Sequence, residues 1–160
     1  MGGLVTPVPP VPLPELGRVH FTGIGGVGMS GLARIMIGRG VKVSGSDAAA
    51  SDVLTVLAEL GAEVHIGHAA ANIDGADTLV TIFHSCHRDA VALERGRTIR
   101  VVNWIHLLAE GMGLPHTDEY KHWRNAEDPR ASIGTDRIAA AGDAAFEQLV
   151  EPELRRAPTI

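Results

Sequence analysis

The sequence predicts an α/β fold, an open parallel sheet of about five strands with helices on both faces and an irregular, partly helical C-terminal tail. Short apolar runs alternate with helical patterns as far as residue 112. Aromatic residues make up only 4% of a chain that is 45% hydrophobic, so the core is expected to be aliphatic. Gly23, Gly25 and Gly28 have the G-x-G-x-x-G spacing between a predicted strand and a predicted helix. Together these features make the predicted sheet Rossmann-like.

The chain divides into three predicted parts: a flexible Pro-rich arm at 1–17, the sheet domain at 18–112 and a tail of unknown role at 113–160. Strands are predicted at 18–22, 41–44, 63–67, 78–83 and 99–102. Helices are predicted at 29–38, about 52–60, 88–95 and 104–112. In the tail, 114–136 shows no clear period, 137–150 has a helical pattern and 151–160 is expected to be a frayed end.

Composition excludes several classes of function. The net charge is −5 and no basic block stands out, so we expect no nucleic-acid partner. No apolar run approaches the length of a membrane span and no signal-peptide pattern is present, so we expect no membrane partner. Cys86 is the only cysteine, which favours a reducing cytoplasm. The Pro-rich arm contains P-x-x-P matches, which leave open an interaction through that arm.

The glycine loop predicts a pyrophosphate at the start of a helix. Gly23 would allow a tight turn, Gly25 would let the pyrophosphate approach the backbone, and Gly28 would let the helix pack closely on the strand. The loop carries no Lys or Arg, so backbone N–H groups and the helix dipole would have to hold the anion. Asp47 ends the second predicted strand, where it could accept hydrogen bonds from a ribose. The alternative is a ligand-free turn with a helix-capping Asp.

Other polar residues give weaker evidence of a function. His68 could line a nucleotide pocket or lie in a solvated loop. The run from His84 to His87 contains Cys86, but one cysteine and two histidines do not make a four-ligand zinc site, so we expect no metal and no catalytic nucleophile. Asp118-Glu119 and Glu127-Asp128 are interpreted as solvated charges.

Three stretches resemble the N-terminal domain of the Mur ligases, the amino-acid ligases of peptidoglycan synthesis. They are Gly23-Ile24-Gly25-Gly26-Val27-Gly28-Met29-Ser30-Gly31, Gly45-Ser46-Asp47 and Gly67-His68. The similarity is greatest to the branch that joins L-alanine to UDP-N-acetylmuramate. It implies that this domain binds the UDP part of UDP-N-acetylmuramate. By the same resemblance, the pyrophosphate would be held by Gly25, Gly26, Gly28, Met29 and Ser30, and the uridine would lie near Ser46, Asp47 and His68.

The sequence departs from the family in two places. The family has a Ser-rich turn and an Asn-Pro-Glu segment after the fourth strand, where this chain has residues 82–88, Ile-Phe-His-Ser-Cys-His-Arg. In full-length members a central domain with a Gly-Lys-Thr loop binds ATP and Mg²⁺, and nothing after Gly113 resembles it. We therefore expect a UDP-sugar-binding domain with no cofactor of its own that does not catalyse ATP-dependent ligation alone. An NAD(P)-binding module or dehydrogenase fragment, and a non-enzymatic partner-binding protein, remain as alternatives.

Overall fold

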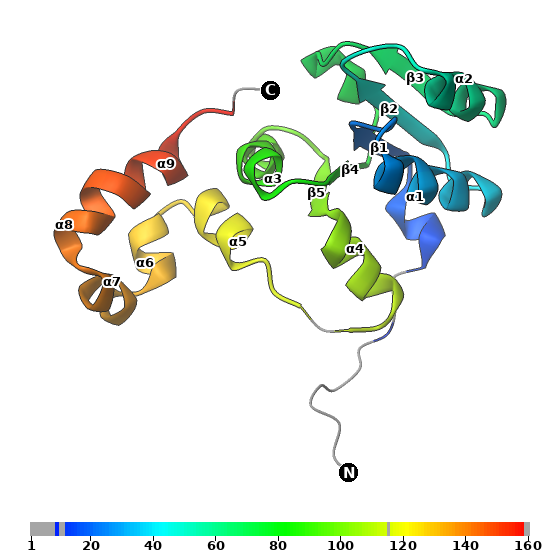
Figure 1. The fold of residues 1–160 in the computed structure, drawn as a ribbon. Helices are drawn as coiled ribbons and strands as arrows, with labels where there is room; N and C mark the ends of the chain where they lie inside the picture. Colours follow the sequence, from blue (N-terminus) through cyan, green and yellow to red (C-terminus); the bar gives the residue numbers. More distant parts are fainter. Residues whose placement is uncertain (1–8, 10–11, 115, 159–160) are drawn as a thin grey trace.

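Five parallel strands form one sheet in the order β3-β2-β1-β4-β5 (Figure 1). The computed structural model describes residues 9, 12–114 and 116–158. The strands are β1 (Val19–Thr22), β2 (Val43–Asp47), β3 (Glu63–Ile66), β4 (Thr78–Thr81) and β5 (Arg100–Asn103). Because β1 pairs with both β2 and β4, the order of the strands reverses direction between β1 and β4. The predicted open parallel α/β sheet is confirmed, and its topological switch point lies at β1 and β4.

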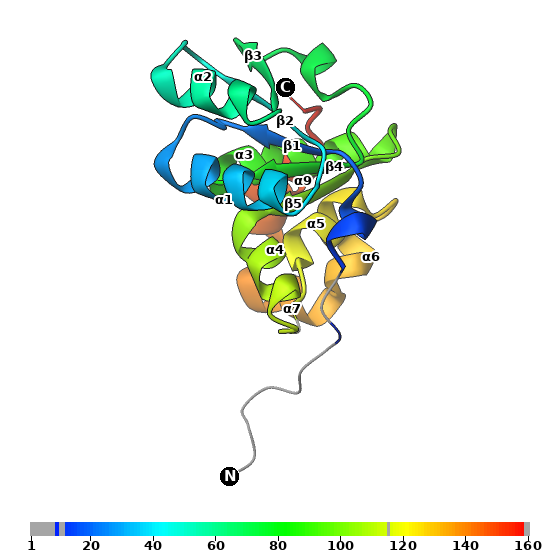
Figure 2. The same cartoon turned by 90° about the vertical axis from the view of Figure 1, so that its right-hand side faces the viewer.

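Helices cover both faces of the sheet (Figure 2). The helices α1 (Val27–Gly38), α2 (Asp52–Glu59) and α4 (Trp104–Gly111) pack on one face. Their core partners include Val19, Phe21, Val80 and Val102. The opposite face is covered at β4 and β5 by α3 (His84–Ala90) and the 3₁₀ helix η3 (Val91–Arg95), which pack with Leu79 and Val101. Alternating residues of the central strands thus serve two separate apolar clusters, as expected for a sheet buried on both sides.

Regular structure is present before the predicted domain boundary at residue 18. The 3₁₀ helix η1 (Leu13–Leu16) buries Leu16, which is 2% exposed, in the α1-side cluster. The Leu16 carbonyl also accepts a hydrogen bond from Thr78 Oγ1 at 2.8 Å. The end of the predicted flexible arm is therefore part of the domain. Residues 1–8 and 10–11, which carry most of the P-x-x-P matches, lie outside the described residues.

The chain after β3 differs in detail from the sequence prediction. A short 3₁₀ helix, η2 (Ala70–Ile73), leads to β4, and β4 ends at Thr81 rather than at residue 83. The helix predicted at 88–95 begins four residues earlier, at His84. Its inward-facing residues include His87 and Asp89, which are 4% and 7% exposed. Because the buried side of this helix is polar, apolar periodicity cannot reveal where it begins.

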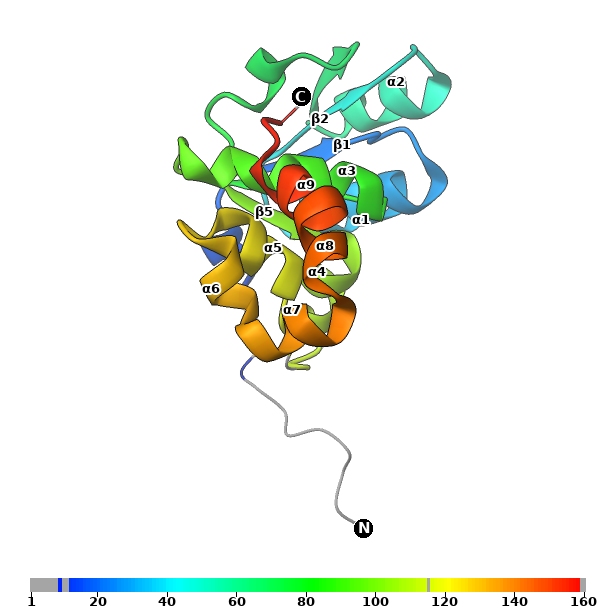
Figure 3. The ribbon, with the colours of Figure 1, turned by 90° about the vertical axis from the view of Figure 1, so that its left-hand side faces the viewer.

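The tail is folded into short helices beside the sheet domain (Figure 3), and its first helix, α5, packs against η3. It consists of α5 (Glu119–Asn125), α6 (Pro129–Ile133), α7 (Thr135–Ala141), α8 (Asp143–Ala145), the π-helical turn η4 (Phe146–Val150) and α9 (Glu151–Arg155). The helix predicted at 137–150 is present but is interrupted at Gly142, whose φ is 94°. The expectation of a frayed end is wrong, since Leu154 in α9 is 1% exposed. No helix in the described ranges is long and apolar enough to cross a membrane.

Candidate functional site

The glycine loop forms a tight connection between β1 and α1. Gly23 has a φ of 74°, which L side chains rarely adopt, and its N–H donates to the Ser46 carbonyl at 2.7 Å. The N–H groups of Ile24 and Gly26 bond to the carbonyls of Ser46 and Gly23 at 3.2 and 3.0 Å. The predicted turn at Gly23 is therefore present, and the loop is fastened to the end of β2.

Helix α1 presents its first turn without a cap. Gly26 is the N-cap residue, and none of the described side chains caps the helix. The first intrahelical bond runs from Ser30 N to the Gly26 carbonyl at 2.8 Å, which leaves the N–H groups of Val27, Gly28 and Met29 as the open donors. Unpaired amides at the positive end of a helix dipole are suited to attract an anion.

Asp47 fixes the glycine loop. Its Oδ2 accepts a hydrogen bond from Gly25 N at 2.8 Å, and its Oδ1 accepts one from Ala48 N at 2.8 Å. A Cβ atom at Gly25 would lie 2.8 Å from that Oδ2 and 3.2 Å from Leu54 Cδ2. The close approach that requires glycine at position 25 in this structure is thus that of the Asp47 carboxylate. At Gly28 a Cβ atom would meet only Ile82 Cδ1 at 3.9 Å, an ordinary contact, so helix packing does not require glycine there.

A buried polar chain crosses the other face of the sheet and ends at His68. His20, which is fully buried, lies 3.0 Å from Ser44 Oγ through Nδ1 and 3.4 Å from Ser46 Oγ through Nε2. The Ser46 hydroxyl is in turn 3.0 Å from His68 Nδ1. Burial, together with the nearby His65, lowers the pKa of His20 to about 4, so the ring is neutral at pH 7. The structure thus brings Ser46 and His68 together and adds His20 and Ser44.

His20 and Ser44 do not appear among the residues expected from the sequence. Their signal is the alternation of the strands: Val19 and Phe21 flank His20, and Val43 and Gly45 flank Ser44. Polar residues on one face of two central strands must find partners there because they are buried. Gly45 has a steric role of its own, because a Cβ atom there would lie 2.5 Å from Ile24 Cδ1 and 2.8 Å from the Phe21 carbonyl oxygen.

Two cavities open at the carboxyl edge of the sheet. The first, which we call the glycine-loop cavity, has a volume of about 560 Å³. Its lining includes Gly23, Gly25, Gly26, Met29 and Asp47. The second, the switch-point cavity, has a volume of about 500 Å³. Its lining includes Thr22, His68 and Thr81. Most of the residues expected to surround one nucleotide are therefore divided between two cavities on either side of the edge of the sheet, but Ser46 lines neither of them.

Gly28 and Ser30 are part of neither lining as described. Both belong to the first turns of α1, and the Ser30 hydroxyl donates to the Val27 carbonyl at 3.3 Å. Ser30 is 9% exposed. Its side chain thus bonds within its own helix and has little surface.

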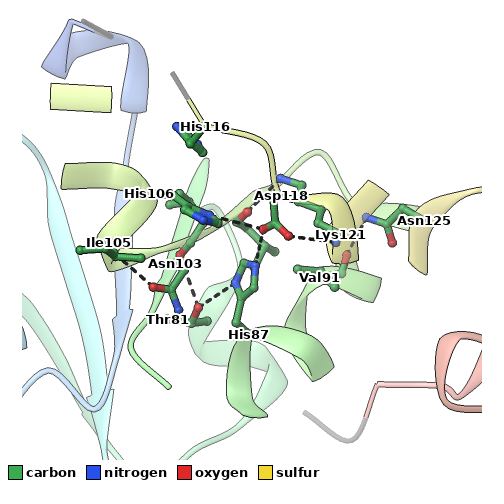
Figure 4. Close-up of polar contacts among 12 residues, drawn as sticks. Thr81, His87, Val91, Asn103, Ile105, His106, His116, Asp118, Lys121 and Asn125 are labelled. Atoms are coloured by element: carbon green, nitrogen blue, oxygen red, sulfur yellow. Dashed lines mark hydrogen bonds and ion pairs between the residues drawn. The ribbon is translucent and has the colours of Figure 1, made fainter. Parts of the chain in front are cut away.

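The run from His84 to His87 contacts the C-terminal tail through His87 (Figure 4). His87 Nδ1 lies 3.0 Å from Thr81 Oγ1, and His87 Nε2 lies 2.6 Å from Asp118 Oδ2. Asp118 also caps α5 by accepting from Lys121 N at 3.0 Å. Cys86 is half-buried at the edge of the switch-point cavity. In the part of the chain that the structure describes, no three His, Cys, Asp or Glu side chains are arranged to hold a metal ion.

Asp118 is therefore not a solvated charge, contrary to the sequence interpretation. Its side chain is 17% exposed. Burial by itself would raise its pKa, but the hydrogen bonds from His87 and from the Lys121 amide lower the pKa to about 2. His106 lies 3.6 Å away through Nδ1 and stacks on His116 with ring centroids 4.6 Å apart. Burial lowers the pKa of His106 below its usual value, although Asp118 opposes this shift.

The fold and this loop define a Rossmann-like α/β domain with a glycine-rich loop between its first strand and its first helix. Residues 18–114 match the family described as "Mur ligase family, catalytic domain". The chain therefore belongs to the Mur ligase family.

Curated relatives agree with this assignment. The UDP-N-acetylmuramate–L-alanine ligase of Thermobifida fusca is 51% identical over 102 residues, which are 62% of this chain and 21% of that protein. The enzyme of the same name from Renibacterium salmoninarum is 53% identical over 104 residues, 64% of this chain and 22% of that protein. The crystal structure of the UDP-N-acetylmuramate–alanine ligase of Thermotoga maritima matches with a TM-score of 0.50 and 26% identity, covering 59% of this chain and 22% of that one. The chain thus spans about a fifth of the length of these relatives.

Proposed function

We propose that this chain binds UDP-N-acetylmuramate as the substrate-binding domain of a peptidoglycan-synthesis ligase. The observation that carries the proposal is the uncapped first turn of α1 beside the glycine-loop cavity. Three adjacent N–H groups and a helix dipole in this position suit a pyrophosphate. The relatives that match this region are ligases of that substrate by name.

The nucleotide sugar is an elongated molecule, and the candidate site has two cavities at the carboxyl edge of the sheet. In our proposal the pyrophosphate lies at the first turn of α1, and groups on either side of it occupy the glycine-loop and switch-point cavities. Met29 and Asp47 line the first cavity and His68 lines the second. Ser46 contributes by orienting His68 through the 3.0 Å contact. A cytoplasmic location is part of the proposal, because UDP-sugars are cytoplasmic metabolites and the single cysteine suits a reducing compartment.

We assign no role in ATP or Mg²⁺ binding to these residues. The glycine loop has no Lys, and the carboxylate at its cavity, Asp47, already accepts hydrogen bonds from Gly25 and Ala48. The proposal is therefore limited to binding of the UDP-sugar.

The proposal is tested by ligand-dependent unfolding of the full chain. Urea denaturation is followed with no ligand, with UDP-N-acetylmuramate, with UDP and with NADH. A ligand that binds only the folded state at a hundredfold excess over its Kd raises the free energy of unfolding by about 2.7 kcal/mol. We expect this increase with UDP-N-acetylmuramate and a smaller one with UDP. Stabilisation by NADH alone would identify an NAD-binding module instead, and no increase with either UDP compound would overturn the proposal.

A further inference from the structure

One residue that lines the switch-point cavity comes from the tail. Arg156, directly after α9, lies on the same cavity as Thr22, His68 and Thr81. Figure 3 shows the chain leaving α9 and running past α3 toward the edge of the sheet. Arg156 lies outside residues 18–114, the range of the family match. The cavity is therefore completed by a part of the chain that the family resemblance does not cover.

The main chain at Arg156 is held in place by a buried arginine. Arg124 in α5 is fully buried, and its guanidinium donates to the carbonyls of Glu153 and Arg156, the latter at 2.9 Å. Arg95 donates to the Leu154 carbonyl at 3.0 Å. These cations bond to carbonyls that the end of α9 would otherwise leave unpaired. The position of Arg156 is thus fixed by contacts that do not involve its own side chain.

The Arg156 guanidinium uses only some of its N–H donors in hydrogen bonds within the protein. Its Nη2 lies 3.3 Å from Asp89 Oδ1 on α3 and 3.2 Å from Glu153 Oε1. Within the described chain, every hydrogen bond that we find from this guanidinium leaves from Nη2. An arginine has five N–H donors in a planar fork, and this side chain is 46% exposed. The remaining donors can therefore serve a ligand while Asp89 keeps the group in position.

Arg156 is distinguished from the other lining residues by its charge. Of the described residues that line the two cavities, Arg156 alone carries a permanent positive charge. The glycine loop offers backbone amides only. A nucleotide sugar with a pyrophosphate brings at least two negative charges, and charge-assisted hydrogen bonds to arginine are stronger than neutral ones.

We propose that Arg156 binds an anionic group of the ligand, a phosphate or a carboxylate, and that the segment after α9 forms one wall of the site. This inference rests on the proposed function, because UDP-N-acetylmuramate carries both kinds of group: its pyrophosphate and the lactyl carboxylate of its sugar. The tail thereby acquires a role in binding the nucleotide sugar.

The test is calorimetric titration of the full chain and its variants with three ligands. UDP and UDP-N-acetylglucosamine carry the pyrophosphate only, and UDP-N-acetylmuramate adds the carboxylate. We expect Arg156→Gln to weaken binding by about tenfold or more. Loss with all three ligands places the contact at the pyrophosphate, and loss with UDP-N-acetylmuramate alone places it at the carboxylate. Arg156→Lys keeps the charge without the fork and should recover part of the affinity.

Arg155→Gln is the matched control. Arg155 is the neighbouring residue, is 54% exposed and pairs with Glu151 within α9, so its loss should leave all three affinities unchanged. If the unaltered chain binds these ligands and Arg156→Gln binds them equally well, the inference is overturned while the proposed function stands. If the unaltered chain binds none of them, the proposed function itself fails.

Discussion

Replacing Val27 with proline probes the first turn of α1 while leaving the fold intact. Val27 is the first helical residue, its side chain is 96% exposed, and its N–H is one of the three open donors. Proline is well tolerated at this position because its φ suits the helix and the N–H has no intrahelical partner. The preceding Gly26 has φ −63° and ψ 149°, a conformation that a following proline permits. The substitution therefore removes one donor and places a ring carbon where its hydrogen was.

The size of the effect follows from the kind of bond removed. A hydrogen bond to a charged group contributes about 1.5–3 kcal/mol, so we expect Val27→Pro to weaken UDP-N-acetylmuramate binding by roughly 10- to 150-fold. The melting temperature without ligand should stay within about 2 °C of the original, because no described contact of the folded chain uses this N–H.

Val27→Ala is the control, since it shortens the same exposed side chain and keeps the N–H. The assay is calorimetric titration of the original chain and both variants, with thermal denaturation of each. If Val27→Pro folds normally and binds as tightly as Val27→Ala, the anion does not lie at the first turn of α1 and our assignment of the pyrophosphate is refuted.

Two further predictions follow from the same geometry. Gly25→Ala should lower the free energy of urea unfolding by about 1–3 kcal/mol, because its Cβ would lie 2.8 Å from Asp47 Oδ2. Gly31→Ala, within α1 and with open space at its Cβ, should raise the free energy of unfolding by up to about 1 kcal/mol. Equal effects of Gly25→Ala and Gly31→Ala would contradict the close contact that we assign to Gly25. The pKa of His20 is about 4 in the folded state and 6.5 in the unfolded state, so the unfolded state takes up this proton first as the pH falls. The free energy of unfolding should therefore decrease by about 3 kcal/mol between pH 6.5 and 4. His20→Gln should reduce this slope in urea titrations across that range, and an unchanged slope would show that His20 is not its source.

The sheet was predictable because its strands and helices follow simple patterns. Apolar strands of four or five residues alternate with helices whose buried residues recur at helical spacing, such as Met29, Ala33 and Met36 in α1. The parallel order follows once each strand is joined to the next by a right-handed crossover. Where the inner face is polar, as at His87 in α3, the same method places the start of the helix four residues too late.

The helical pattern at 137–150 was visible in the sequence, but the packing of the tail could not be predicted, because its helices are short and many of its contacts to the sheet domain are polar. Arg124 is fully buried yet reads as a surface residue in the sequence. Asn125 donates from Nδ2 to the Val91 carbonyl at 3.0 Å, and Lys121 donates from Nζ to the Val101 carbonyl at 2.9 Å. Such bonds depend on backbone carbonyls of distant elements, and side-chain type along the chain does not reveal those partners.

Part of the candidate site could be predicted from the sequence and part could not. The glycine spacing correctly located the turn at Gly23, because the turn depends on local backbone conformation, whereas the helix predicted at 29–38 begins two residues earlier, at Val27. The grouping of Ser46 with Asp47 at one nucleotide is different, since neighbouring residues of a strand point to opposite faces of its sheet. Ser46 contacts His20 and His68 on one face, whereas Asp47 fastens the glycine loop on the other.

The end of β2 therefore connects the two cavities mechanically. Any shift of this strand end would move Asp47, which fixes Gly25, and Ser46, which orients His68, at the same time. A small anion at the first turn of α1 would use only the glycine-loop side. An elongated ligand with its charge near the middle could use both sides together, including Arg156 at the switch-point cavity. The proposed ligand, a nucleotide sugar, is elongated in this way, whereas free phosphate and pyrophosphate are not.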